Sequence, residues 1–233
     1  MTTVAPIHVD DPILDAPVIS ARDLGKRHGA VPIWTDVSFS IRSAETAAIV
    51  GPSGSGKSTL LHCVGLLDRV DDGRLELDGA DVTRIGRAAQ RHHFRMGVGH
   101  LFQNYALVEN WTVDRNLDPA FIGRRIRRAE RAERRASALE RVGLAGAGHR
   151  KTYSMSGGEQ QRIALARLLL KAPRVVVADE PSAALDDDNV AMVLSVLGEM
   201  RDAGSAIVIA THDPRVADWC DQRIDLGAAA AVE

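Results

Sequence analysis

Short apolar runs of strand length alternate along the chain with helical patterns of apolar residues. The runs TAAIV (46–50), VVVA (175–178) and AIVIA (206–210) are continuously apolar, as are strands of a parallel sheet buried on both faces. Residues 18–41 instead alternate apolar and polar positions, which predicts half-buried antiparallel strands, and RLELDG reads as another strand ending in a turn. Helical patterns are predicted at 57–67, 126–142 and 189–200.

This order of elements predicts an α/β fold with a mainly parallel sheet, an N-terminal antiparallel β-subdomain and an inserted helical subdomain. We expect a single domain over residues 17–227. Within it, residues 17–103 and 171–227 are expected to form the core, and residues 104–170 the helical insert.

The chain ends and the composition argue against several classes of protein. Residues 1–16, rich in Pro and Asp, and residues 228–233 are expected to be flexible tails, and the N-terminus has neither the basic nor the apolar region of a signal peptide. The longest apolar runs are far shorter than the roughly 20 residues that span a bilayer. A net charge of −2 gives no overall attraction to nucleic acid or to an anionic membrane, and two distant cysteines suit a reducing cytosol. The chain is therefore expected to be soluble and to form no membrane path by itself.

The predicted helix at 126–142 is rich in arginine, which on its own is compatible with a nucleic-acid contact. Three glutamates, Glu130, Glu133 and Glu140, are interspersed with these arginines. Opposite charges three or four residues apart pair on the surface of a helix. The pattern therefore favours a solvated, internally paired face, and no nucleic-acid partner is expected.

A glycine-rich loop follows the strand TAAIV and matches the full pattern G-x-x-x-x-G-K-[ST]. The loop and the start of its helix comprise Gly51, Pro52, Ser53, Gly54, Ser55, Gly56, Lys57, Ser58 and Thr59. Glycines allow several backbone N–H groups to point at one anion, and the helix that follows adds its positive end. Lys57 can reach the β- and γ-phosphates of a nucleotide, and the Ser58 hydroxyl can bind Mg²⁺. The loop predicts a P-loop NTPase core with a nucleoside triphosphate site, but many enzyme classes share it.

Two carboxylates and a histidine follow the next two apolar runs. Asp179 ends a strand at the sheet edge where the phosphate loop opens, which suits a magnesium ligand. Glu180 comes next and is a candidate general base for the attacking water. His212 occupies the same position after AIVIA, and its spacing alone leaves both a catalytic and a surface role open.

A second candidate anion site begins at Ser156, Gly157, Gly158 and Glu159, directly before the helical run IALARLLL. Two glycines before a helix, with a serine as an extra donor, again place free N–H groups at a positive helix end. A chain with one phosphate loop needs no second one for the same nucleotide. We infer that this segment binds the nucleotide of a different molecule.

These segments together resemble the ATP-binding subunits of ABC transporters. The resemblance spans about residues 18–227 and includes GPSGSGKST, LFQN, MSGGEQQR, VVVADEP, SAALD and THD in family order. It implies that Gln103 contacts Mg²⁺ and senses a membrane partner, that the loop ending at Asp186 crosses a dimer interface, and that His212 lies near the γ-phosphate. Two positions depart from the family pattern. Met155 replaces the usual leucine before the signature serine, and His28 replaces the tyrosine that stacks on adenine.

The resemblance also implies the partners. Two copies are expected to face each other head to tail, with each ATP and its Mg²⁺ between the phosphate loop of one copy and Ser156–Gly158 of the other. Hydrolysis would then drive separate membrane-spanning permease subunits, which hold the ATPase at the cytoplasmic face of the membrane.

The stretch LFQNYALVENWTVDRNL is similar to the subgroup of lipoprotein-releasing, macrolide-efflux and cell-division ATPases, and to exporters of bacteriocin-like peptides. This similarity favours export of a peptide, a lipid-linked molecule or a hydrophobic cargo. The alternatives are a non-transporting ATPase that regulates a cell-wall or cell-division membrane protein, and an importer. A soluble ABC protein acting on DNA or ribosomes needs long coiled-coil arms or two ATPase domains, and 233 residues leave room for neither.

Overall fold

The computed structural model of the protein describes residues 16–183 and 186–227. The two expected tails, 1–16 and 228–233, therefore lie outside the described residues, except for Ala16. In the part of the chain that is described, no helix is both long and apolar enough to cross a membrane.

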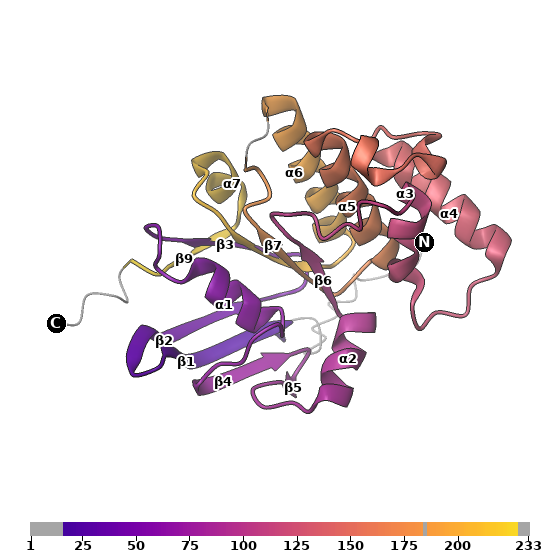
Figure 1. Cartoon of the computed structure of the whole chain (residues 1–233). Coiled ribbons are helices and arrows are strands. Elements are labelled where there is room, and N and C mark those ends of the chain that lie inside the picture. Colours follow the sequence, from indigo (N-terminus) through magenta and orange to yellow (C-terminus); the bar gives the residue numbers. More distant parts are fainter. Residues whose placement is uncertain (1–15, 184–185, 228–233) are drawn as a thin grey trace, which may run out of the picture.

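The predicted α/β architecture is confirmed, with one antiparallel and one parallel sheet (Figure 1). The antiparallel sheet has the order β2-β1-β4-β5, and the parallel sheet has the order β6-β7-β8-β3-β9. The strands are β1 (Ile19–His28), β2 (Val31–Ile41), β3 (Thr46–Val50), β4 (Asp72–Leu77), β5 (Ala80–Asp81), β6 (Val98–Leu101), β7 (Val175–Asp179), β8 (Ala206–Ala210) and β9 (Gln222–Asp225). The helices are α1 (Lys57–Val64), α2 (Arg87–Met96), α3 (Val113–Leu117), α4 (Arg128–Arg141), α5 (Gly157–Lys171), α6 (Asp187–Asp202) and α7 (Pro214–Trp219), with short 3-10 turns at Asp118–Phe121, Ala147–His149 and Thr152–Ser154.

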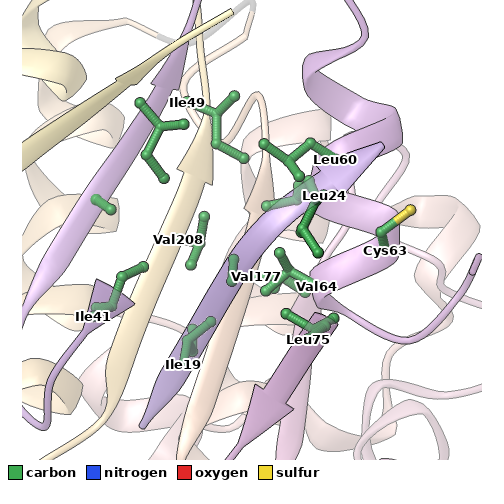
Figure 2. Close-up of a cluster of buried hydrophobic side chains, with 14 of the residues drawn as sticks. Ile19, Leu24, Ile41, Ile49, Leu60, Cys63, Val64, Leu75, Val177 and Val208 are labelled. Carbon is green, nitrogen blue, oxygen red and sulfur yellow. The ribbon is translucent and has the colours of Figure 1, made fainter. Parts of the chain in front are cut away.

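The central parallel strands are buried on both faces, as their continuously apolar sequences predict. In β7, Val177 points into a core shared with α1 and the antiparallel sheet, whereas Val176 points into a second core with the helices of the other face. The first of these cores is shown in Figure 2, where Leu24 of β1, Leu60 of α1 and Val208 of β8 gather between the sheets. Alternate residues of one strand thus hold the two halves of the molecule together.

All three predicted helices have different boundaries in the structure, and the one expected at 126–142 is the slightly shorter α4. The helix expected at 57–67 ends at Val64, because Gly65 closes its last turn and Leu66 takes a left-handed conformation with φ 61°. The helix expected at 189–200 begins earlier, at Asp187, since the Asp186 side chain accepts a hydrogen bond from the Asn189 N–H and caps it.

The internally paired face predicted for the arginine-rich helix is present in part in α4, through one glutamate. Arg134 pairs with Glu130 at 2.7 Å, one helical turn away. Arg135 reaches Asp118 at 2.6 Å, beyond the helix itself. Charge pairing therefore anchors α4 to the neighbouring turn.

Helix α5 is tied to the loop that follows β6. The Arg167 guanidinium donates hydrogen bonds to the carbonyls of Tyr105, at 2.8 Å, and of Ala106, at 2.7 Å. Both acceptors lie within three residues of Gln103. These two hydrogen bonds attach the loop to the C-terminal part of α5.

Candidate nucleotide-binding site

The phosphate loop joins β3 to α1 at the carboxyl edge of the parallel sheet (Figure 1). Gly56 ends the loop with φ 86°, and a Cβ there would lie 2.5 Å from Ile33 Cγ2 and 2.8 Å from Trp34 Cδ1. Only glycine fits both this conformation and this space. The contact packs β2 directly under the loop and so fixes its shape.

The side chains of the loop leave polar groups available for an anion. The Lys57 ammonium donates to the carbonyls of Gly51 and Pro52, both at 3.0 Å, and so lies across the loop. The Ser55 hydroxyl is buried and has no hydrogen-bond partner among the described residues. Phosphate oxygens would supply the acceptors for Lys57 and Ser55. Ser53, Gly54 and Thr59 complete the loop and the first turn of α1.

Three predicted magnesium ligands come to the same sheet edge. The Ser58 hydroxyl donates to Asp179 Oδ1 at 3.0 Å, which joins the first turn of α1 to the end of β7. Gln103 is exposed two residues beyond β6, whose Leu101 pairs with Ala178 of β7. No hydrogen bond joins Gln103 to Ser58 or Asp179 within residues 16–183 and 186–227.

His62 was missed by the sequence analysis. Its Nε2 lies 3.9 Å from Asp179 Oδ2. It stands four residues after Ser58 on α1, so the spacing of the helix was the signal that could have found it.

Glu180 and His212 are in direct contact. His212 Nδ1 lies 2.9 Å from Glu180 Oε2, and the backbone N–H of His212 donates to the same oxygen at 3.3 Å. Glu180 has φ 47°, a left-handed conformation that costs a non-glycine residue about 1–3 kcal/mol. Its backbone N–H still bonds to the Ala210 carbonyl at 2.9 Å, so the sheet holds it in this conformation. Glu180, in this strained conformation, and His212 therefore lie together at the ends of β7 and β8.

The serine–glycine segment forms the N-terminus of α5 and is capped from both sides. Ser156 Oγ accepts from the Glu159 N–H at 3.2 Å, while Glu159 Oε2 accepts from the Ser156 N–H at 2.8 Å. Arg150, a residue that sequence analysis also missed, holds Glu159 Oε1 at 3.1 Å. The hydrogen bond from the Ser156 backbone holds the pKa of Glu159 below its usual value, with Arg150 adding to the effect. Glu159 is therefore a charged anchor for the segment.

This capped segment is separate from the phosphate loop of the same chain. Gly157 is exposed and Gly158 half-buried at the start of α5, where backbone N–H groups lack partners within a helix. Among the described residues, no hydrogen bond or ion pair joins 156–159 to 51–59. His28 is also exposed, at the end of β1.

The loop ending at Asp186 is described in part. Ala184 and Leu185 lie outside the described residues. Asn189, in the first turn of α6, accepts a hydrogen bond from Arg162 of α5 at 2.8 Å. The start of α6 is therefore attached to the same helix that begins at Ser156.

Comparisons with known proteins identify the family of the chain. A family profile described as "ABC transporter" matches residues 34–183. The lipoprotein-releasing system ATP-binding protein LolD of Anaeromyxobacter dehalogenans is 40% identical over 197 residues, which is 84% of this chain and 82% of LolD. The pyoverdine export ATP-binding/permease protein PvdT of Pseudomonas aeruginosa is 38% identical over 206 residues, which is 86% of this chain but 31% of that longer protein.

Solved structures are similar over nearly the whole chain. The dimeric structure of MJ0796, a bacterial ABC transporter cassette, superposes with a TM-score of 0.82 at 28% identity, and covers 90% of this chain and 95% of MJ0796. A post-hydrolysis state of the same cassette, bound to ADP and Pi, has a TM-score of 0.81 at 29% identity. The resemblance that the motifs indicated is thereby confirmed: the chain belongs to the ABC transporter family, as an ATP-binding and ATP-hydrolysing cassette.

Proposed function

We propose that two copies of this chain enclose two ATP molecules head to tail and drive an exporter in the membrane. The observation that carries this proposal is the second anion site at Ser156–Gly158, capped and exposed but unconnected to the phosphate loop of its own chain. A partner copy would bring that site to the γ-phosphate. The MJ0796 cassette, similar over 90% of this chain, is a dimer in its solved structure.

Each residue of the site has a role in this arrangement. Lys57 and the N–H groups of the loop hold the phosphates, with Ser53, Gly54, Ser55, Gly56 and Thr59 shaping the cradle. His28, exposed at the end of β1, would face the adenine. The Glu180 carboxylate accepts a proton from the attacking water, since its Oε1 receives no hydrogen bond in the described residues. His212 holds Oε2 through Nδ1 and leaves Nε2 to the γ-phosphate.

The residues present suit Mg²⁺, a hard cation that prefers oxygen ligands. Ser58 Oγ and Asp179 Oδ1 are 3.0 Å apart, and Gln103 supplies a carbonyl oxygen at the same sheet edge. When bound, Mg²⁺ neutralises charge on the β- and γ-phosphates. Ser58 and Asp179 would hold it. Gln103 would also contact it and so couple the ion to residues 105 and 106, which Arg167 holds.

The membrane partner and the cargo are proposed from the relatives. PvdT is named as an ATP-binding and permease protein in one chain, and LolD as the ATP-binding protein of a lipoprotein-releasing system. By analogy, separate permease subunits would hold this chain at the cytoplasmic face of the membrane. The exported cargo would be a peptide, a lipid-linked molecule or another hydrophobic compound.

Substitution of the general base tests the hydrolytic dimer. In Glu180→Gln, ATP binding should be retained, turnover should fall by about 10²–10⁴, and an ATP-dependent dimer should accumulate in size-exclusion chromatography. Glu133→Gln, an exposed glutamate on α4, is the matched control and should behave as wild type. A Glu180→Gln variant that hydrolyses ATP at the wild-type rate would refute the role of Glu180.

The membrane role needs a separate test. The wild-type chain, purified from membranes together with its permease, should hydrolyse ATP faster when a hydrophobic peptide or lipopeptide is added. Stimulation without movement of the cargo across a reconstituted bilayer would assign the complex to regulation instead of export.

A further inference from the structure

An edge of the molecule formed by α2 and by the segment before α4 carries unbalanced positive charge. Residues 82–108 contain no Asp or Glu, and residues 119–129 contain none either. Exposed arginines in these two segments, here called the arginine face, are Arg84, Arg87, Arg91, Arg95, Arg125, Arg127 and Arg128. None of the seven forms an ion pair in the described part of the chain.

The two segments meet at the C-terminal end of α2. On α2, Arg87, Arg91 and Arg95 recur every four residues, so they lie along one side of the helix. A Cβ on Gly123 would lie 3.7 Å from Arg95 Cδ, so the chain that enters 124–128 packs against this row. Helix α2 buries none of its residues completely and lies at the outer edge of the molecule (Figure 1).

Two large apolar side chains are exposed where the two segments meet. Met96 is 45% and Ile122 54% exposed, and a Cβ on Gly123 would lie 4.0 Å from Met96 Sδ. Arginines around exposed apolar side chains are typical of surfaces that lie in the headgroup region of a bilayer, where guanidinium groups meet phosphates and apolar groups enter the acyl boundary. Nucleic acid would use the arginines but not Met96 or Ile122.

The overall charge of −2 does not oppose such binding. Salt screens charges beyond about 8–10 Å, so acidic residues on the remote faces contribute little at this edge. The local charge of the seven arginines therefore sets the attraction to an anionic surface.

We propose that the arginine face, with Met96 and Ile122, binds the headgroups of anionic phospholipids in the membrane. This contact is additional to any permease and does not use the nucleotide site. It would orient the ATPase on the bilayer directly.

Vesicle co-sedimentation of the full chain tests the proposal. We expect stronger binding to vesicles that contain phosphatidylglycerol than to pure phosphatidylcholine, and weaker binding as salt rises. The triple variant Arg87→Gln, Arg91→Gln, Arg95→Gln should lower the partition coefficient on the order of a hundredfold, since each basic residue near such a surface contributes about fivefold. Met96→Ser with Ile122→Ser should lower it severalfold and leave the salt dependence unchanged.

The matched control removes three arginines that are paired elsewhere, as Arg42→Gln, Arg141→Gln, Arg201→Gln. This triple changes the net charge equally and should bind vesicles as wild type does. ATP hydrolysis in solution and thermal unfolding should be unchanged in the arginine-face variants, which separates this proposal from that of the catalytic dimer. Equal binding to both vesicle types, equal loss in both triples, or binding of poly-glutamate without vesicle binding would each overturn the proposal.

Discussion

Single residues set the shape of the phosphate loop as much as its hydrogen bonds do. Gly56 and Gly54 both have left-handed conformations, with φ 86° and 82°. They differ in their surroundings, because a Cβ on Gly56 would overlap Ile33 and Trp34, whereas a Cβ on Gly54 would have no atom within 4 Å. Substitutions at these two glycines can therefore distinguish the free-energy cost of backbone strain from that of overpacking.

A pair of alanine substitutions measures this difference. Gly54→Ala should lower the free energy of unfolding by about 1–2 kcal/mol, the cost of a left-handed non-glycine residue. Gly56→Ala should lose about a further 1–3 kcal/mol from overpacking against β2. Urea denaturation of both variants checks the difference, and Ile33→Ala should recover part of the loss in Gly56→Ala. Equal destabilisation of the two variants would show that β2 yields to the new side chain.

At the scale of elements, β6 places the titratable ring of His100 between the end of α1 and Phe94 of α2. His100 Nε2 lies 2.9 Å from the Gly65 carbonyl at the end of α1, and the ring stacks on Phe102 with centroids 5.3 Å apart. Burial lowers the pKa of His100 to about 4, and the hydrogen bond to Gly65 only partly opposes this shift. The neutral ring is therefore part of the folded packing.

This packing makes the fold sensitive to acid. The unfolded chain protonates His100 near its ordinary pKa of 6.5, but the folded chain does so only near 4, so the unfolded state binds more protons between these values. Stability should consequently fall as pH drops from about 6.5 to 4, by at most on the order of 3 kcal/mol. His100→Gln keeps a donor for Gly65 without the titration, and its unfolding free energy should lose this part of the pH dependence. Identical pH profiles for the two proteins would contradict the assignment.

The central apolar strands and the longer helices could be predicted from the sequence, but their ends, smaller elements such as α2 and α7, and the tertiary contacts could not. Continuous apolar runs gave β3 and β8 without error, because burial on both faces leaves no room for polar residues. The end of α1 depended on Leu66 adopting a left-handed conformation, which propensity does not indicate. Arg150 contacts Glu159 only through the tertiary structure, so local pattern did not reveal it. His62, which lies near Asp179, could have been found from its helical spacing to Ser58.

For the whole molecule, the proposed head-to-tail arrangement divides each ATP site between two chains. Lys57 belongs to one half of a site and Ser156 to the other, and no contact joins their segments within the described residues of one copy. Each copy therefore contributes two different half-sites. A substitution in one half-site should leave the other half-site of the same copy intact.

Mixing two inactive variants tests this division. Ser156→Arg should still bind ATP as a monomer but should neither dimerise nor turn over, while Lys57→Ala should lose ATP binding. An equimolar mixture should regain hydrolysis, because the loop of the Ser156→Arg copy and the Ser156 of the Lys57→Ala copy form one intact site. Steady-state phosphate release measures the recovery. A mixture as inactive as its components, while mixed dimers form, would contradict the shared site.

Helix α5 carries Ser156 at its first turn and Arg167 near its last, where Arg167 grips the loop of Gln103. The fifteen residues of α5 form one continuous helix about 22 Å long, so we expect its two ends to move together. In the proposed dimer, a shift of the Gln103 loop by a membrane partner would therefore tilt the end of α5 that faces the neighbouring copy. Movement of the membrane partner and closure of the dimer over ATP would then be coupled through this one helix.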